Sequence, residues 1–377
     1  MHKLPPLSLY IHIPWCVQKC SYCDFNSHTL KGKMPHLEYV YHLLTDLEND
    51  IVLTNGRGVN TLFIGGGTPS LLSIRAIQLL LDGIRARIML MLDAEITIEV
   101  NPGTVDVERF LGYKQAGVNR ISLGVQSFDL EKLNSIGRIH DGQDTHRAAQ
   151  QAVSLGLRSV NFDLMYGLPD QTLVGALDDL MQAIVLAPSH LSWYQLTIEP
   201  NTLFWAQPPK LPNDDILWNI SQKGKQLLQA AGYCQYEISA YARAGFQCNH
   251  NLNYWRFGDY LGIGCGAHGK LTQLDGTVMR TVKNHHPRGY MQGNNYLSQR
   301  YLVAPSDLPF EYFMNRFRLL EATPRAEFTA YTGLDESKVR TALDTALASG
   351  FITESTHYWQ VTDKGKSFLN LLLELFI

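Results

Sequence analysis

Apolar residues recur along the first two thirds of the chain in two alternating patterns. Short runs rich in β-branched and aromatic residues are typical of strands, and longer stretches with apolar residues every three or four positions are typical of amphipathic helices. The expected strands are 7–13, 61–66, 95–100, 120–127, 159–167 and 190–197. The expected helices are 36–54, 73–88, 104–116, 142–155, 173–186 and 214–231.

This alternation of strand and helix predicts a parallel sheet, because consecutive parallel strands need a right-handed helical crossover between them. Six such units fit an open, incomplete (β/α)6 barrel better than a closed barrel of eight strands. The fold expected for residues 1–235 is therefore α/β, with a partial barrel. Functional groups should gather at the C-terminal ends of its strands, where the loops from strand to helix lie.

The alternation stops at about residue 235. Residues 236–305 are rich in glycine and aromatic residues and indicate an extension of the barrel. Residues 306–377 predict helix, turn, helix, short hairpin and helix, a mostly helical C-terminal domain that resembles a winged helix. Its expected recognition helix, 337–349, carries only Lys338 and Arg340 as basic residues. We therefore expect this domain to pack or to dock a partner rather than to bind DNA.

Composition and charge narrow the choice of partner and compartment. The net charge of −3 gives no basic field that would attract nucleic acid. The first residues lack an apolar run long enough for a secretory signal. The terminal stretch LNLLLELFI is too short to cross a bilayer and contains Glu374. These features predict a cytoplasmic protein with no nucleic-acid partner and no transmembrane segment, and they leave a peripheral membrane contact open.

The six cysteines are unevenly placed. Three of them lie within eight residues with the spacing C-x3-C-x2-C, namely Cys16, Cys20 and Cys23. The others are scattered and are expected to be small buried residues: Cys234, Cys248 and Cys265. In a reducing compartment, a tight cysteine group more often binds metal than forms disulfides. Three close thiolates would hold three irons of an iron–sulfur cubane and leave one iron open for chemistry. The alternatives are three unliganded thiols, or a zinc site completed by His12 or His28.

Other chemical groups follow the expected strands at the same end of the barrel. Residues 65–69 read GGGTP, where missing side chains let the backbone approach a small ligand closely. Glu99 lies in a mostly apolar strand and needs a partner, which the ammonium or hydroxyl groups of a ligand would supply. Polar side chains at the later strand ends and loops are Gln126, Arg138 and Asp163. Each of these polar groups could instead form an internal ion pair or a capping hydrogen bond. The glycines could instead serve only to form a tight turn.

The cysteine spacing, with Tyr22 before the last cysteine, resembles the motif of the radical S-adenosylmethionine (SAM) superfamily. YIHIPWC, FIGGGTPS, IEVNPGT, GVNRISLGVQSF, NFDLMYGLPDQT and WYQLTIEPNT resemble its oxygen-independent coproporphyrinogen III oxidase-like family, and the likeness covers almost the whole chain. This resemblance implies a [4Fe-4S] cluster on the three cysteines. SAM would chelate the open iron of this cluster, and the reduced cluster would cleave SAM to methionine and a 5′-deoxyadenosyl radical. The implied SAM contacts are Tyr10, Tyr22, Gly66, Gly67, Thr68, Glu99, Gln126, Arg138, Asp163 and Ile263.

Two features differ from the true oxidases of that family. Phe25 stands where the oxidases have a further cysteine, two residues after the third cluster cysteine. Only nine residues precede Tyr10, whereas the oxidases usually have a longer segment there. Both features match the haem-chaperone branch of the family. That branch implies a protein that binds haem and passes it to acceptor proteins, with respiratory haemoproteins among the candidates.

The stretch CNHNLNYW, residues 248–255, offers a candidate haem contact and resembles a motif associated with haem binding in the chaperone branch. Imidazole is a common haem ligand, so His250 would ligate or orient haem while flanking aromatic rings cover the porphyrin. The alternative is that His250 is a hydrogen-bonded histidine that shapes the barrel mouth, with Tyr254 and Trp255 in the core. The function expected is that of a haem chaperone binding a [4Fe-4S] cluster, SAM and haem, without oxidase activity and without an assigned catalytic residue. Coproporphyrinogen III oxidase and an iron–sulfur-sensing winged-helix regulator are the alternatives.

Overall fold

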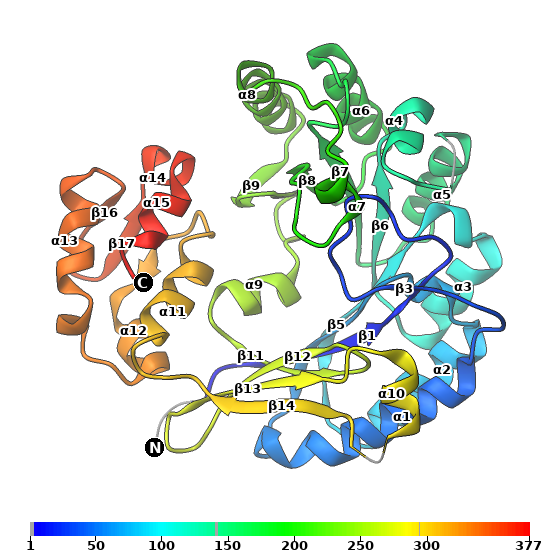
Figure 1. The fold of residues 1–377 in the computed structure, drawn as a ribbon, viewed down its shortest axis with the longest axis horizontal. Coiled ribbons are helices and arrows are strands. Elements are labelled where there is room, and N and C mark those ends of the chain that lie inside the picture. Colours follow the sequence, from blue (N-terminus) through cyan, green and yellow to red (C-terminus); the bar gives the residue numbers. More distant parts are fainter. Residues whose placement is uncertain (1–3, 140–141, 294) are drawn as a thin grey trace.

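The centre of the computed structural model is one curved sheet of twelve strands, and the structure describes residues 4–139, 142–293 and 295–377 (Figure 1). The strand order is β14-β13-β12-β11-β1-β4-β5-β6-β7-β8-β10-β9. Six neighbouring strands are the ones expected from the sequence, and they pair in parallel. They are β1 (Leu7–Ile13), β4 (Val59–Gly66), β5 (Leu90–Val100), β6 (Arg120–Gln126), β7 (Ser159–Tyr166) and β8 (His190–Gln195). The predicted incomplete (β/α)6 barrel is confirmed.

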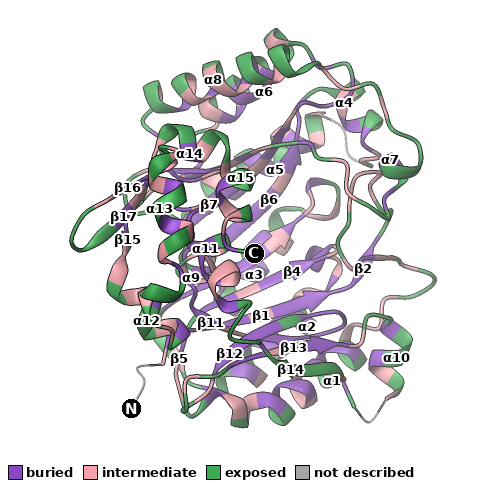
Figure 2. Ribbon diagram, turned by 60° about the vertical axis from the view of Figure 1, so that its left-hand side comes forward, coloured by how far each residue is buried: buried purple, intermediate pink, exposed green. Residues whose placement is uncertain are grey.

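Helices cover the outer, convex face of this sheet (Figure 1). They are α1 (His36–Asp50), α2 (Ile74–Arg85), α3 (Val107–Ala116), α5 (Gly142–Ser154), α6 (Leu173–Val185) and α8 (Asp214–Ala230). In α2, the Ser73 hydroxyl accepts a hydrogen bond from Ala76 N and caps the helix, a contact worth about 1 kcal/mol. The same helix buries Ile77 and Leu80, and the outer faces of the helices are exposed (Figure 2). Amphipathic periodicity therefore explains how these helices pack.

Alternation along each strand gives the two faces of the sheet different chemistry, because successive side chains point to opposite faces. In β1, Leu9 and Ile11 belong to the main apolar core, whereas Ser8, Tyr10 and His12 alternate with them. Ser8 forms a buried hydrogen bond of 2.7 Å with Thr61 of β4. The inner face of the barrel is therefore polar, and polar side chains lead along it toward the strand ends.

The region after β8 extends the sheet on both sides. On one side, β9 (Cys234–Glu237) and β10 (Ala240–Ala242) continue from β8 in antiparallel pairing. The chain then forms α9 (Asn249–Trp255) and returns as β11 (Asp259–Ile263), which pairs in parallel with β1. An antiparallel meander completes this side and includes one short helix: β12 (His268–Thr272), β13 (Val278–Lys283), α10 (Pro287–Gln292) and β14 (Leu297–Leu302).

The C-terminal segment has its own apolar core, centred on Phe313, Phe328 and Trp359. Its helices are α11 (Leu308–Arg316), α12 (Arg325–Thr332), α13 (Arg340–Ala348), α14 (Asp363–Ser367) and α15 (Leu369–Glu374), and its small sheet contains β15 (Thr323–Pro324), β16 (Ile352–Glu354) and β17 (Tyr358–Val361). This order agrees with the predicted winged-helix-like domain. Ion pairs join the segment to the barrel side, including Arg256 with Glu321 and Arg318 with Glu237. In the described part of the chain, no helix is long and apolar enough to cross a membrane.

Candidate functional site

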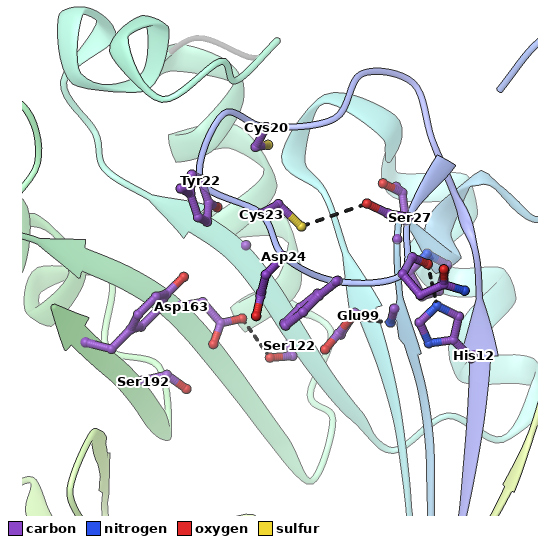
Figure 3. A pocket seen from close by; sticks show the side chains of 18 of the residues that line it. His12, Cys20, Tyr22, Cys23, Asp24, Ser27, Glu99, Ser122, Asp163 and Ser192 are labelled. Carbon is purple, nitrogen blue, oxygen red and sulfur yellow. Dashed lines mark hydrogen bonds between the residues drawn. The ribbon is translucent and has the colours of Figure 1, made fainter. Parts of the chain in front are cut away.

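A cavity of about 1180 Å³ opens at the C-terminal ends of the barrel strands. The loop that carries the cysteines passes over these strand ends, and Glu99, Ser122 and Asp163 lie beneath it (Figure 3). The cavity brings together all but one of the site residues predicted from the sequence. They are Tyr10, Cys16, Cys20, Tyr22, Cys23, Gly66, Gly67, Thr68, Glu99, Gln126, Arg138, Asp163 and His250. The exception is Ile263, which is fully buried in β11 beside Ile11 and does not line the cavity.

Backbone hydrogen bonds hold the cysteine loop at both ends. Cys16 lies in β2 (Trp15–Cys16), which pairs with β3 (His28–Thr29), so the start and the end of the loop are side by side. Between them, Ser21 N donates to Ile136 O at 3.2 Å, and Ser21 O accepts from Phe204 N at 3.0 Å. The loop is thereby fixed to the barrel and also to the short helix α7 (Leu203–Ala206).

The three thiols suit an iron–sulfur cluster in their surroundings and their charge. The pKa of the Cys16 thiol is raised, chiefly by burial and further by the neighbouring Cys23 and Cys20. A hydrogen bond from Thr68 lowers this pKa but does not cancel the increase. Burial also raises the pKa of Cys23, whose sulfur contacts Ser27 Oγ at 3.9 Å. Three thiolates crowded in this way need positive charge nearby, and the irons of a cluster supply it. The donor set therefore fits a cluster.

The histidines that could have completed a zinc site have other partners. His12 lies 3.0 Å from Tyr10 Oη through Nδ1 and 2.8 Å from Asn26 O through Nε2. His28 Nε2 donates to His285 O at 3.0 Å. Among the described residues, no three His, Cys, Asp or Glu side chains are grouped so that they could hold one metal ion. A cubane has no such requirement, because each cysteine binds a different iron.

The glycine-rich turn after β4 packs directly against the cysteine strand. Gly66 has φ +114°, and a Cβ atom there would lie 2.6 Å from the ring of His12. A Cβ atom on Gly67 would lie 2.6 Å from Trp15 O and 3.1 Å from Cys16 Sγ. The Gly67 and Thr68 amides also donate to Ile13 O and Trp15 O, each at 2.7 Å. These glycines are needed for the close approach of two backbones, and the same approach exposes the turn to the cavity.

Two carboxylates lie on the cavity floor. Glu99, near the end of β5, accepts a hydrogen bond of 3.0 Å from Gly66 N. Burial, followed by the charge of Asp163, raises the pKa of Glu99 to about 8. Asp163 of β7 accepts from Ser122 Oγ at 2.9 Å and from Asn161 Nδ2 at 2.8 Å. A cationic ligand in the cavity would stabilise the charged form of Glu99.

Gln126 and Arg138 line another part of the cavity, where Arg138 contacts the cysteine loop. Gln126 has φ +65°, a left-handed conformation that is uncommon for a residue other than glycine and that recurs at functional sites. Its Oε1 accepts from Tyr194 Oη at 2.7 Å. Arg138 donates to Gly124 O at 3.1 Å and to Cys20 Sγ at 3.7 Å. Its Nε is buried and has no hydrogen-bond partner among the described groups, so a bound ligand has a donor to satisfy here.

His250 lies deep in the barrel with both ring nitrogens engaged. It is 1% exposed. Its Nδ1 lies 2.8 Å from Thr61 Oγ1 and its Nε2 lies 2.7 Å from Tyr254 Oη. Its ring also stacks on Phe63, with 5.0 Å between the centroids. Burial lowers the pKa of His250 to about 3, so the ring is neutral. This arrangement supports the alternative in which His250 shapes the barrel mouth, and its role as a haem ligand stays a prediction.

One expectation about the isolated cysteines is wrong. Cys248 and Cys265 are buried as expected, and Cys248 Sγ contacts Glu95 Oε1 at 3.6 Å. Cys234 is exposed, because it begins the edge strand β9, which has a sheet neighbour on one side only.

Tyr194 and Arg120 are functional groups of the site that were not predicted from the sequence. Tyr194 of β8 positions Gln126, and Arg120 of β6 lies 2% exposed on the cavity floor, where its charge lowers the pKa of Glu99. Both lie on the inner face of their strands, at alternate positions. The alternation of polar and apolar residues in 120–126 and 190–195 was the available signal.

Two family models match separate parts of the chain. The model described as the radical SAM superfamily matches residues 10–180. The model described as the HemN C-terminal domain matches residues 303–368. The first contains the three cysteines and most of the cavity floor, and the second covers most of the C-terminal segment.

Two relatives match along almost the whole of both chains. The chain is 67% identical over 377 residues to heme chaperone HemW of Escherichia coli (strain K12), covering 100% of both chains. It is 32% identical over 375 residues to heme chaperone HemW of Bacillus subtilis (strain 168), covering 98% of this chain and 99% of the other. The solved structure of coproporphyrinogen III oxidase (HemN) from Escherichia coli has a TM-score of 0.84 at 24% identity, covering 99% of this chain and 90% of that one. The last likeness shows the fold alone.

Proposed function

Because this chain belongs to the radical SAM superfamily, and within it to the family of heme chaperone HemW, we propose that it is a haem chaperone. It holds a [4Fe-4S] cluster and SAM as cofactors, binds haem as its cargo, and passes the haem to acceptor proteins. The observation that carries this proposal is the full-length identity of 67% to a heme chaperone, which includes both the barrel and the C-terminal segment.

The cavity residues divide into those that would hold the cluster and those that would hold SAM. Cys16, Cys20 and Cys23 supply three thiolates on a loop that is fixed to the barrel. The turn at Gly66 and Gly67 offers backbone groups to SAM. The other SAM contacts that were predicted from the sequence and line the cavity offer their polar side chains. When bound, the cluster supplies a low-potential electron close to SAM.

The chain's own groups set the charge at this site. Glu99, with its raised pKa, is poised to exchange a proton when a cationic ligand arrives. Arg138 places positive charge against the Cys20 sulfur. The hydrogen bond from Tyr194 Oη positions the side chain of Gln126. These residues act as binding and positioning groups, and the proposal assigns no catalytic residue.

Oxidative decarboxylation of coproporphyrinogen is the second candidate, because the fold is shared with an oxidase at a TM-score of 0.84. Phe25 opposes it. This side chain is 57% exposed, lines the cavity and stands where the oxidases have a further cysteine. A phenyl ring presents an apolar surface to a porphyrin and has no acid–base or redox chemistry of its own. The site therefore supports porphyrin binding more than porphyrin oxidation.

Regulation through DNA has little support from the C-terminal segment. Arg340, at the start of α13, forms ion pairs with Glu336, Asp344 and Glu354. A guanidinium engaged in this way is not available for phosphate contacts. The segment is instead proposed to pack against the barrel and to dock protein partners. We further propose a cytoplasmic location, with respiratory haemoproteins among the acceptors.

The function is tested by anaerobic reconstitution with iron and sulfide, followed by titration with haem and by an assay with coproporphyrinogen and SAM. A Cys16/Cys20/Cys23→Ala triple variant serves as the cluster-free control. The proposal expects a cluster only in the unaltered protein, saturable haem binding, and no decarboxylation. Decarboxylation with consumption of SAM would select the oxidase instead, and absence of haem binding would reject the chaperone.

A further inference from the structure

The cavity extends past the cysteine loop to a rim formed by the β12–β13 side of the sheet. His268 begins β12, and His285 follows the end of β13. Both side chains are exposed, both line the cavity, and their ring centroids are 6.1 Å apart. We call this pair the rim histidines. Since β11 runs parallel to β1, the turn from β11 to β12 lies at the same end of the barrel as the cysteine loop.

Among the described histidines around the cavity, the rim histidines are the ones with both ring nitrogens free of hydrogen bonds. His250 and His12 have both ring nitrogens engaged. His28 is engaged through Nε2, and His286 Nδ1 accepts from Arg288 N at 3.3 Å. No hydrogen bond to a described residue engages either ring of the rim pair. A histidine ligates iron through a ring nitrogen that has no other partner. Among the described cavity histidines, the rim pair therefore offers the most ring nitrogens for ligation.

Backbone hydrogen bonds fix the position of the rim. Gly266 N donates to Asn284 O at 2.8 Å, and Lys283 N donates to Ala267 O at 2.9 Å. The cysteine loop is tied to the same turn, because Asn26 Nδ2 donates to Cys265 O at 3.1 Å. The rim is thus held beside the cluster loop before any ligand arrives, as a preorganised binding site requires.

Two groups of the cysteine loop complete a site for an iron porphyrin. Phe25, more than half exposed, lines the same cavity and offers an aromatic face. Lys19 is exposed, lines the cavity, and donates to Phe25 O at 3.1 Å, so its ammonium is available near that ring for a carboxylate. The cavity volume of about 1180 Å³ exceeds the roughly 300–1,000 Å³ typical of a single small-molecule pocket. It leaves room for a second ligand beside SAM.

We propose that the rim histidines, His268 and His285, supply the axial imidazole ligation of haem. Phe25 packs against the porphyrin, and Lys19 pairs with a propionate. The inference rests on the proposed function and names its cargo site, at the rim rather than at His250. Haem held there lies at the open end of the cavity, next to the cysteine loop. An acceptor protein could reach it there without displacing the residues that face SAM.

The test titrates the reconstituted full-length protein with haem and records visible and electron paramagnetic resonance spectra. The variants are His268→Ala/His285→Ala, His285→Met and, as a control, His357→Ala, which alters an exposed histidine of the C-terminal segment. We expect the double variant to bind haem at least tenfold more weakly and to lose the imidazole-ligated spectrum. Added free imidazole should restore that spectrum. His285→Met is expected to keep haem with an altered axial-ligand signature, and His357→Ala is expected to match the unaltered protein.

Each outcome separates this inference from the function on which it rests. An unaltered protein that binds no haem would reject the proposed function itself. An unaltered protein that binds haem, with the same affinity and spectrum in the double variant, would overturn the rim site alone. Loss of the imidazole spectrum in His250→Ala, with the double variant unchanged, would assign the ligand to His250. A rim pair that binds Ni²⁺ but does not affect haem would identify a simple metal site and would also overturn the proposal.

Discussion

The backbone amide of Gly66 donates a hydrogen bond of 3.0 Å to Oε2 of Glu99. This contact joins the C-terminal end of β4 to that of β5, so the glycine-rich turn and the carboxylate form one unit. A substitution on either side changes the shape and the charge of the same part of the cavity. The contact also makes Glu99 a useful probe, because its protonation is linked to burial and to binding.

Glu99→Gln should reduce the pH dependence of stability in the cluster-free protein. Burial raises the pKa of Glu99 from 4.5 to about 8, so between these pH values the folded state keeps a proton that the unfolded state has lost. The free energy of unfolding therefore falls as pH rises across this range. Glutamine keeps an acceptor for Gly66 N and has no charge to bury. Denaturant titrations from pH 5 to 8 should give a flatter profile for the variant. An equally steep profile in both proteins would contradict this assignment.

Gly67→Ala should impair cluster assembly without unfolding the barrel. The new methyl group would lie 2.6 Å from Trp15 O and 3.1 Å from Cys16 Sγ, so the cysteine strand must shift. We expect iron and sulfide per chain to fall severalfold after reconstitution. Gly175→Ala in α6 is the matched control, because its methyl group would meet only Thr172 Oγ1 at an ordinary 3.5 Å. Full cluster loading in Gly67→Ala would show that this contact is not required.

Cys16→Ala should remove the cluster and leave the fold intact. The barrel core forms from strands and helices outside the cysteine loop, so we expect a loss of about 1 kcal/mol or less in unfolding free energy. Visible absorption and circular dichroism of the reconstituted protein measure both effects. Cys234→Ala, at an exposed position, should retain the cluster. Global unfolding of Cys16→Ala would mean that the loop contributes to the barrel core.

Arg138→Lys should make the cluster harder to reduce. Arg138 donates to the Cys20 sulfur at 3.7 Å while it also holds Gly124 O, and a lysine cannot reproduce both contacts. Hydrogen bonds to cluster sulfurs raise the reduction potential, so we expect a fall of roughly tens of millivolts. An anaerobic redox titration measures it, with Lys132→Arg as a control on α4 (Leu130–Ser135). An unchanged potential with an intact cluster would show that the contact does not tune it.

The parallel barrel and the cysteine loop could be predicted from the sequence because their signals are local. Runs such as 7–13 and 159–167 have strand composition, and the glycines and polar side chains follow them at fixed points in each unit. Since parallel strands end at one face, the residues from Tyr10 to Asp163 had to meet there. The structure agrees, and it places these residues in one cavity.

The features that could not be predicted depend on contacts between distant parts of the chain. Nothing local indicates that β11 returns to pair with β1, and this pairing brings the rim histidines to the cysteine loop. The contact of His250 with Thr61 of β4 likewise joins distant parts of the chain. The sequence predicts a buried Cys234, and only the strand order of the sheet shows that it lies on an exposed edge.

The decisive measurement for a haem chaperone is the transfer of haem from this protein to a haem-free acceptor. The reconstituted, haem-loaded protein is mixed anaerobically with an acceptor stripped of its haem, and the acceptor's own spectrum and activity are followed with and without SAM. We expect haem to move to the acceptor faster than free haem is released into buffer, and the rate of this transfer to differ in the cysteine triple variant. Haem that stays bound, or that leaves at the rate of simple dissociation, would contradict a chaperone.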